Sequence, residues 1–287
     1  MDIYHVSDKI RNETPSFPIN LNPANITREL FEPALPLKII IHGFVGHRDY
    51  SPNIEVRPAL LQYQQVYVLT VDYGTIAELP CYYPWAVSNA GVVSKCLALL
   101  IDNLIDDGIY RSEDVHIIGF SLGAQIAGIT ANYLRNRLRR ITGLDPAGPA
   151  FATDNLSHRL DPSDADFIDI IHTDPFGLST IATLGHVDFY PNLGQLSQPG
   201  CGIGQEGRIV NCNHYRAPRY YAESIKKSQE FWAYNCGNWL HFLLQRCNEY
   251  VKTPQTKMGY YVSEDAVGSY FLTTHSKTPY AKGPLKT

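Results

Sequence analysis

A serine lies between two glycines where an apolar run gives way to a helical pattern. Residues 119–123 read Gly-Phe-Ser-Leu-Gly, with Ser121 at the centre. The apolar run starts at Val115, and apolar residues at helical spacing continue from Leu122 to Arg135. A strand, a sharp turn and a helix in this order form the nucleophile elbow, which holds a serine hydroxyl above the edge of a sheet. The motif predicts that Ser121 is a catalytic nucleophile.

A serine hydroxyl is a poor nucleophile, so it needs a histidine base and a carboxylate that orients the base. Asp145 is the candidate acid because it follows the next apolar run and because Pro146 ends that run. Asp169 and Asp174 are the alternatives. We expect Asp169 to lie within a strand, away from the serine, whereas Asp174 ends a strand one position further along.

Three histidines compete for the role of the base. His214 fits the chain order serine, acid, histidine, and it lies between Cys212 and a helix predicted to start near Pro218. His172 and His186 are the other candidates. Spacing alone does not choose among the three.

Two backbone amides beside the serine are candidates for an oxyanion hole. His42, Gly43 and Phe44 follow the first apolar run, where the second donor is expected. The amides of Phe44 and Leu122 would hold the negative charge of a tetrahedral intermediate, each worth about 3 to 4 kcal/mol. We expect His42 itself to be a core histidine that bonds to backbone groups.

Short apolar runs alternate with helical patterns from residue 37 to residue 172. In chain order, the patterns predict a strand at 37–42, a short helix near 59–63, a strand at 66–71, a helix at 89–106, a strand at 115–119, a helix at 122–135 and strands at 141–144 and 167–172. This alternation is typical of an α/β fold with a mostly parallel sheet covered by helices on both faces. Functional groups then gather at the carboxyl ends of the strands. Loops rich in Gly, Pro and Asn follow Leu184, and since no linker interrupts the chain we predict one domain over residues 1–287.

Composition excludes several classes of protein. Hydrophobic residues make up 44% of the chain and charged residues 18%, as in an ordinary globular protein. The net charge of −4 gives no support for nucleic-acid binding. The longest apolar runs are far shorter than the roughly 18 residues of a membrane span, so we predict no transmembrane segment. No His-Glu-x-x-His or paired Cys-x-x-Cys string supports a metal hydrolase.

Six cysteines form three pairs that are close in sequence, and each pair would close a short loop. The predicted disulfides are Cys81–Cys96, Cys201–Cys212 and Cys236–Cys247. Sequons for N-glycosylation start at Asn12, Asn25 and Asn155. Both features favour a secreted, extracellular glycoprotein. The first residues lack the basic and apolar regions of a signal peptide, so we expect that signal upstream of this sequence or missing from this form.

The chain also closely resembles the pancreatic-type lipase family of α/β-hydrolases, which includes triacylglycerol lipases and phospholipases A1 of the wasp-venom kind. The matching strings run in order through nearly the whole chain: Ile-Ile-His-Gly-Phe at 40–44, Gly-Phe-Ser-Leu-Gly-Ala-Gln at 119–125, Ile-Thr-Gly-Leu-Asp-Pro-Ala at 141–147, Arg-Leu-Asp-Pro-Ser-Asp-Ala-Asp at 159–166, Ile-His-Thr-Asp at 171–174, Gly-His-Val-Asp-Phe-Tyr-Pro-Asn at 185–192 and Cys-Asn-His-Tyr-Arg at 212–216.

The resemblance implies roles for individual residues. It assigns the nucleophile to Ser121, the acid to Asp145 and the base to His214, with oxyanion donors at Phe44 and Leu122. It implies no required cofactor. The sequence ends near Thr287, before the carboxy-terminal β-sandwich that binds colipase in digestive lipases, so colipase dependence is not expected.

A structural calcium ion is a further expectation from the resemblance. Residues 159–164 match a calcium loop in which Asp161 and Asp164 would be the carboxylate ligands, and calcium accepts carboxylate and carbonyl oxygens. This chain has Leu156 where the family often has an acidic residue. The alternative is that the two aspartates cap the following helix or face solvent.

Two loops govern substrate class in this family, and both are short here. The lid, residues 202–211, is brief and rich in glycine, and the loop from Asp174 to Gly185 is shorter than in digestive lipases. Short loops resemble the phospholipase A1 pattern, so the expected reaction is hydrolysis of the 1-acyl ester of phospholipids at a membrane or lipoprotein surface. The alternatives are a triacylglycerol or galactolipid lipase and a non-catalytic, yolk-like lipid-binding protein.

Overall fold

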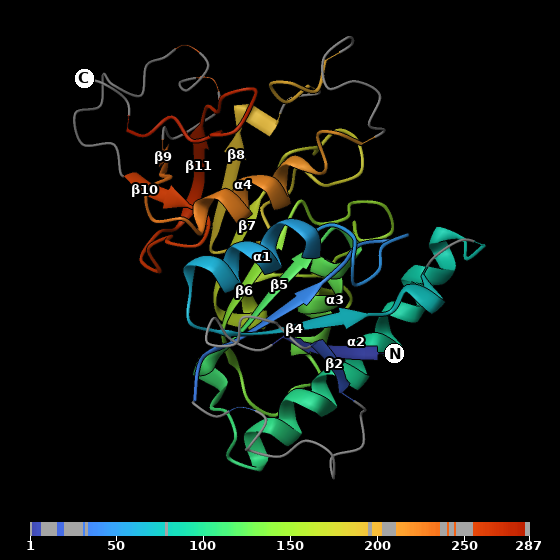
Figure 1. Ribbon diagram of the computed structural model, residues 1–287. Coiled ribbons are helices and arrows are strands. Elements are labelled where there is room, and N and C mark those ends of the chain that lie inside the picture. The colour runs from blue at the N-terminus through green and yellow to red at the C-terminus, as the bar shows by residue number, and fades with distance from the viewer. Residues whose placement is uncertain are drawn as a thin grey trace.

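The computed structural model describes residues 2–6, 16–19, 31, 34–77, 80–194, 197–202, 211–235, 240, 244 and 255–284. Within these ranges one sheet of eleven strands forms the centre of the molecule, in the order β10-β9-β11-β8-β7-β6-β5-β3-β4-β1-β2 (Figure 1). The strands are β1 (Asp2–Val6), β2 (Ser16–Ile19), β3 (Leu37–Ile41), β4 (Tyr67–Asp72), β5 (Val115–Phe120), β6 (Leu138–Leu144), β7 (Ala165–Ile171), β8 (Val187–Pro191), β9 (Phe231–Tyr234), β10 (Gln255–Met258) and β11 (Gly268–Leu272). The helices are α1 (Asn53–Tyr63), α2 (Tyr83–Asp106), α3 (Leu122–Ala131) and α4 (Arg216–Ser224).

Seven strands in the middle of the sheet are parallel. They run β4, β3, β5, β6, β7, β8 and β11, and antiparallel strands flank them at both ends. Strands such as β3 and β5 are almost entirely apolar because helices cover both faces of the sheet and leave no solvated side. All seven carboxyl ends therefore meet at one edge, where the loops that follow them gather.

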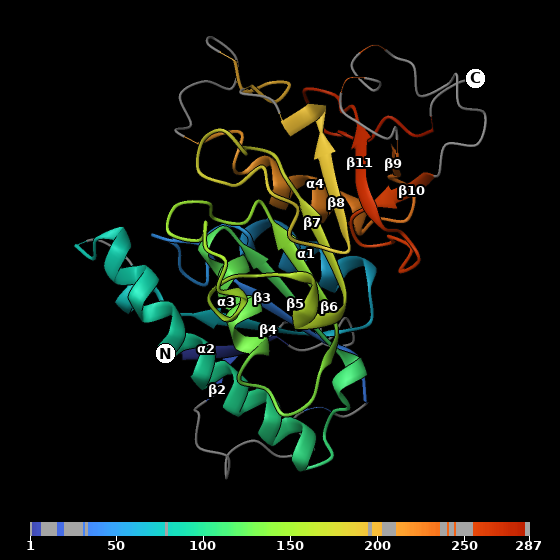
Figure 2. The ribbon, with the colours of Figure 1, turned by 180° about the vertical axis from the view of Figure 1, so that it is seen from behind.

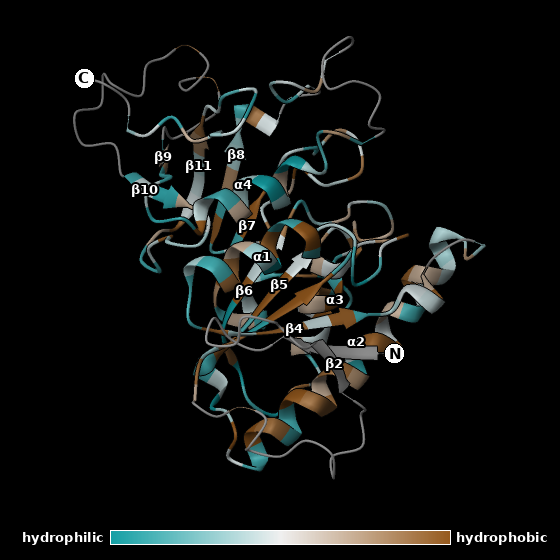
Figure 3. Cartoon of the chain, in the orientation of Figure 1, coloured by the Kyte–Doolittle hydropathy of each residue, from teal (hydrophilic) through white to brown (hydrophobic). Residues whose placement is uncertain are grey.

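The helices form a layer on each face. Apolar residues of α2 and α3 pack with one set of strand residues, whereas α1 and α4 pack with the set that points the other way. Figure 2, seen from behind, shows α2 and α3 in front of the sheet, and Figure 3 shows the most hydrophobic strands between the two layers. This arrangement is an α/β-hydrolase fold, so the predicted fold class is confirmed.

Several boundaries differ from the sequence expectation: α1 starts at Asn53 rather than near residue 59, α3 ends at Ala131 rather than near 135, and β6 starts at Leu138 rather than at 141. Helix α2 starts at Tyr83 rather than near residue 89, because Tyr82 is extended and Pro84 fits the first turn, where a helix needs no amide donor. After Leu184 the chain forms β8, α4, β9, β10 and β11, not loops alone. These strands are short and lie among turn residues, so their alternation is weak in the sequence.

The predicted disulfide between Cys81 and Cys96 is wrong, because both thiols are free. Cys96 lies on the fourth turn of α2, and a helix rises about 1.5 Å per residue, so the thirteen residues from Tyr83 to Cys96 span about 20 Å. A disulfide needs Cα atoms within about 7 Å. Cys201 and Cys212 do form the predicted bond, and Cys236 and Cys247 lie outside the described residues.

Helix α2 is long and apolar enough to cross a bilayer by length and composition. In this fold ten of its residues are buried, including Val93, Leu97 and Ile101, which pack in the same core as α3. Its exposed face carries Trp85, Val92 and Leu99. The helix is thus a layer of the hydrolase fold with an apolar outer face.

Packing around the start of α3 gives a stability prediction. A Cβ at Gly119 would overlap backbone atoms of Gly123 and Ala124, so Gly119→Ala should lower the free energy of unfolding by about 2 to 3 kcal/mol. Gly91→Ala is the control, because nothing lies within 4 Å of a Cβ there and alanine favours a helix by up to about 1 kcal/mol. Urea unfolding of both variants checks the contrast; equal effects would contradict it.

Candidate active site

Ser121 occupies a strained turn between β5 and α3. Its φ is 55° and its ψ −121°, a conformation that is costly for a residue with a side chain. The turn is held because Ser121 N–H donates to Leu144 O, while Ser121 O accepts from the amides of Ala124 and Ala147. These bonds fix the serine beside the segment that follows β6. The strand, turn and helix expected from the motif are all present.

Asp145 follows β6 directly and is completely buried. Its Oδ1 accepts hydrogen bonds from the amides of Thr173, at 2.7 Å, and Asp174, at 3.0 Å. Its Oδ2 lies 2.6 Å from Nδ1 of His214. Three donors therefore surround this carboxylate, which is how a buried charge becomes tolerable.

His214 lies in the turn before α4, close to the serine and the acid. Cys212, two residues earlier, is bonded to Cys201, which anchors this turn. The imidazole packs on Phe120, the neighbour of Ser121, with ring centres 4.5 Å apart. Since Nδ1 faces Asp145, Nε2 is the nitrogen left for exchange of a proton. The structure thus gathers Ser121, Asp145 and His214 at one edge of the sheet.

The alternative acids and bases have other partners. Asp169 lies within β7 and pairs with Arg140 at 2.8 Å. Asp174 accepts from the amide of Leu178, and burial, together with the Asp145 carboxylate, raises its pKa.

His172 pairs with Asp188, and His186 accepts from the amide of Ile168. Of the three histidines, His214 is the one that contacts Asp145 among the described residues.

The loop after β3 lies against the serine. A Cβ on Gly43 would be only 2.9 Å from the Cβ of Ser121. The next residue, Phe44, packs edge-to-face on Tyr83 with ring centres 5.2 Å apart. Leu122 is the first residue of α3, where helix amides have no partner within the helix. Gly43, the residue before Phe44, and Leu122 therefore both lie next to Ser121, and the oxyanion role of the Phe44 and Leu122 amides stays a prediction.

His42 supports this loop through backbone groups. Tyr73 N–H donates to Nε2 at 3.1 Å, which leaves Nδ1 to donate to Gly43 O at 2.8 Å. The ring also stacks on Tyr73, whose hydroxyl donates to His42 O at 2.6 Å. No pattern in the sequence pointed to Tyr73, because its contacts with His42 arise only once β4 lies beside β3.

Asp72 also bonds to this loop, since its carboxylate accepts hydrogen bonds from the amides of Arg48 and Gly74. Burial alone would raise its pKa, but the nearby His42 ring and the amides of Gly74 and Arg48 outweigh burial and lower the pKa to about 2. The ionised carboxylate thus stabilises the fold around the serine.

Comparison with known proteins agrees with this geometry. The model of the family described as Lipase matches residues 10–280. This chain belongs to the lipase family. Inactive pancreatic lipase-related protein 1 of Homo sapiens is 34% identical over 94% of the chain and 63% of its own length. Pancreatic lipase-related protein 2 of Homo sapiens is 36% identical over 84% of the chain and 55% of its own length.

The chain therefore spans about 60% of the length of these lipase relatives. Among solved structures, Est1E from Butyrivibrio proteoclasticus with bound ferulic acid is 21% identical and covers 43% of this chain and 46% of its own, with a TM-score of 0.30. A likeness at that level adds nothing to the family assignment.

The loop that the lipase family uses for calcium forms a helix cap here. Oδ1 of Asp161 accepts from Ser163 N, while Asp164 accepts from Asp161 N and from Asn132. Only Oδ2 of Asp161 is buried without a partner. Among the described residues no group of three or more His, Cys, Asp or Glu is placed to hold a metal ion. These residues fit a cap better than a calcium shell, and calcium stays a prediction.

One further contributor to the site escaped sequence reasoning. Gln125 lies on α3; its side-chain amide donates to Ala147 O at 2.7 Å, and its carbonyl accepts from Leu160 N at 2.9 Å. It joins the elbow helix to the segment after Asp145. Its place in the motif string was the only available signal.

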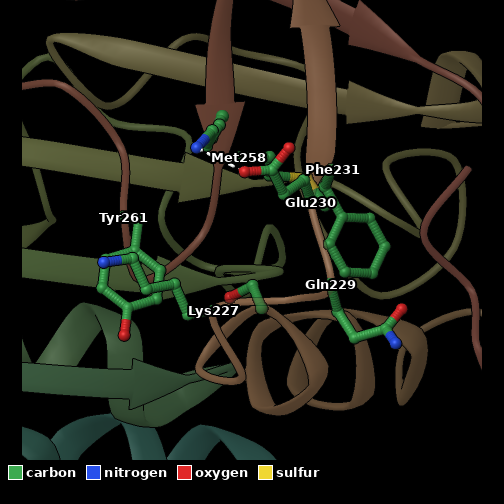
Figure 4. A pocket seen from close by; sticks show the side chains of 8 residues that line it. Lys227, Gln229, Glu230, Phe231, Met258 and Tyr261 are labelled. Atoms are coloured by element: carbon green, nitrogen blue, oxygen red, sulfur yellow. Dashed lines mark ion pairs between the residues drawn. The ribbon is translucent and has the colours of Figure 1, made fainter. Parts of the chain in front are cut away.

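A separate pocket lies far from this edge, between the end of α4 and strands β9 and β10 (Figure 4). Its lining is Ser224, Lys227, Gln229, Glu230, Phe231, Lys257, Met258 and Tyr261. Lys257 and Glu230 form an ion pair across it at 2.6 Å. It contains none of the candidate catalytic residues.

The lowered pKa of Asp72 gives a pH-dependent stability prediction. The carboxylate stabilises the fold above its ordinary value of 3.8 and loses this effect as pH falls through about 2. Asp72→Asn should therefore cost about 1 to 2 kcal/mol at neutral pH, allowing for partial exposure. Urea unfolding from neutral to strongly acidic pH measures the cost, which should shrink once the pH falls below the ordinary value. A constant difference would contradict this assignment, and exposed Asp107→Asn is the control.

Proposed function

We propose that this chain hydrolyses carboxylic esters of lipids through Ser121, His214 and Asp145. The observation that carries the proposal is the 2.6 Å contact between His214 Nδ1 and Asp145 Oδ2 at the edge where Ser121 is held in its strained turn. Membership of the lipase family supports the ester class. The geometry supplies a nucleophile, a base and an orienting acid in the order that serine hydrolases require.

The reaction proceeds in two steps. His214 Nε2 takes the hydroxyl proton while Ser121 Oγ attacks the ester carbonyl, and the amides of Phe44 and Leu122 hold the resulting oxyanion. The imidazolium then returns the proton to the departing alcohol, which leaves an acyl group on Ser121. Water, activated by the same imidazole, releases the fatty acid and restores the serine. Asp145 stays ionised and keeps His214 in position.

The substrate we propose is a phospholipid, cleaved at its sn-1 ester on a membrane or lipoprotein surface. The disulfide joins Cys201 to Cys212, which are eleven residues apart, so the lid between them is short. The loop from Asp174 to Gly185 is also short. Exposed apolar side chains, Phe176 and Ile181, lie on that second loop. A short lid would leave space for a polar headgroup. Residues 203–210 of the lid lie outside the described residues.

Two alternatives have specific support. Neutral glycerides or galactolipids would suit the same apolar loop. A non-catalytic lipid-binding role is suggested by the word inactive in the name of the pancreatic lipase-related protein 1 relatives. The intact set of Ser121, Asp145 and His214 argues for catalysis in this chain.

We also propose an extracellular location. The Cys201–Cys212 disulfide requires an oxidising compartment to persist. The sequon at Asn155 lies on an exposed segment, where a glycan could be accommodated.

Hydrolysis is tested with phosphatidylcholine and triolein, each with the native protein and Ser121→Ala. We expect 2-acyl lysophospholipid from the native protein and a loss of at least about 10⁴-fold in kcat for the variant. Turnover of triolein alone would favour the neutral lipase. Binding of lipid without turnover of either ester would overturn the enzymatic proposal in favour of the carrier.

The identity of the acid is tested separately. Asp145→Asn should lower kcat by about 10³ to 10⁴-fold, because the imidazole would lose its orienting charge. Asp174→Asn is the matched comparison, since its side chain bonds to the amide of Leu178 and to Asn213 and not to the imidazole of His214, and it should cost less than about tenfold. Ester hydrolysis with a soluble short-chain substrate measures both. Reversal of the two effects would move the acid to Asp174.

A further inference from the structure

The structure contains a second buried histidine–aspartate pair that the proposed mechanism does not use. His172 follows β7, Asp188 lies in β8, and Nε2 of the ring is 2.8 Å from Oδ1 of the carboxylate. Both side chains are buried, with 0% and 1% exposed. A polar pair buried this deeply needs compensating hydrogen bonds, so the partners of His172 and Asp188 show which part of the chain the pair holds.

Both ring nitrogens of His172 face oxygen acceptors. Besides the contact with Asp188, Nδ1 lies 2.9 Å from the backbone carbonyl of Thr180. The ring stacks on Tyr190, with centres 4.6 Å apart. A carbonyl and a carboxylate can only accept, so the ring satisfies both by donating from both nitrogens.

The pair and its neighbours hold the second half of one loop, residues 174–185. Asp188 accepts hydrogen bonds from the amides of Leu184, at 3.0 Å, and Gly185, at 3.2 Å. Tyr190, stacked on the histidine, donates its hydroxyl to Ile181 O at 3.1 Å. Together with the bond from His172 to Thr180, these contacts tie down four residues of the 174–185 loop.

The first half of the same loop is bonded to the catalytic edge. Leu178 N–H donates to Asp174, and Ser179 Oγ donates to Pro146 O at 2.8 Å. The loop begins at Asp174, whose amide holds the Asp145 carboxylate. A shift of the 174–185 loop would therefore displace a donor to the catalytic acid.

We propose that His172 and Asp188 are positioning residues that fix the 174–185 loop and, through it, the orientation of Asp145. The inference rests on the proposed function for its catalytic consequence. The 174–185 loop also carries the exposed apolar side chains of Phe176 and Ile181.

The test compares His172→Phe, which keeps the ring stacked on Tyr190 but removes both hydrogen bonds, with His116→Phe. His116 is equally buried, bonds to Thr142 on a different part of the sheet, and serves as the control for general destabilisation. Hydrogen exchange followed by mass spectrometry should show at least about tenfold faster exchange over residues 174–185 in His172→Phe only. Below the melting temperature of both variants, kcat for phosphatidylcholine should fall at least about tenfold in His172→Phe and less than about twofold in His116→Phe.

Two further measurements separate positioning from stability. Spectra of protein labelled with ¹⁵N-histidine should show protons on both ring nitrogens of His172. His172→Gln, which retains a donor, should recover part of the lost kcat. Unchanged exchange over residues 174–185 in His172→Phe, or a singly protonated ring in the native protein, would overturn the proposal. If the native protein hydrolyses no ester, the proposed function fails, while the exchange and spectra still decide whether the pair holds the loop.

Discussion

The edge of the sheet that carries Ser121 depends on the hydrogen bonds that surround the buried carboxylate of Asp145. A charge removed from water must be surrounded by donors, and this one receives two amides from the segment after β7 and one ring nitrogen from the turn before α4. The two amides are neighbours in the chain, whereas the ring nitrogen comes from a segment about 40 residues later. The hydrogen bonds to the two oxygens of Asp145 therefore fix both the start of the 174–185 loop and the position of His214.

Two histidine–aspartate pairs lie near the same edge with different surroundings. His214 gives one nitrogen to Asp145, and its ring packs on Phe120, the residue before Ser121. His172 has both nitrogens engaged and is completely buried. We therefore propose proton transfer for one pair and a fixed loop for the other, although the residue types are the same. The difference lies in the second ring nitrogen, which in His172 faces the Thr180 carbonyl and in His214 is the one that the proposed mechanism uses for proton transfer.

The sequence was informative where local chemistry determines structure. The apolar runs located β3 to β7, and the glycines around Ser121 located the elbow, because a tight crossing of backbones leaves no space for Cβ atoms. Spacing left three histidines open, since a base reaches its serine only through the tertiary fold. The Cys81–Cys96 error has the same origin: proximity in sequence becomes about 20 Å when the intervening residues form a helix.

The positive φ of Ser121 has a consequence for selection. Glycine adopts that conformation without steric cost, whereas serine there gives up of order 1 to 3 kcal/mol. A sequence optimised only for thermodynamic robustness would carry glycine at position 121. The hydroxyl is therefore retained at a cost in stability, which the packing of the rest of the fold must offset.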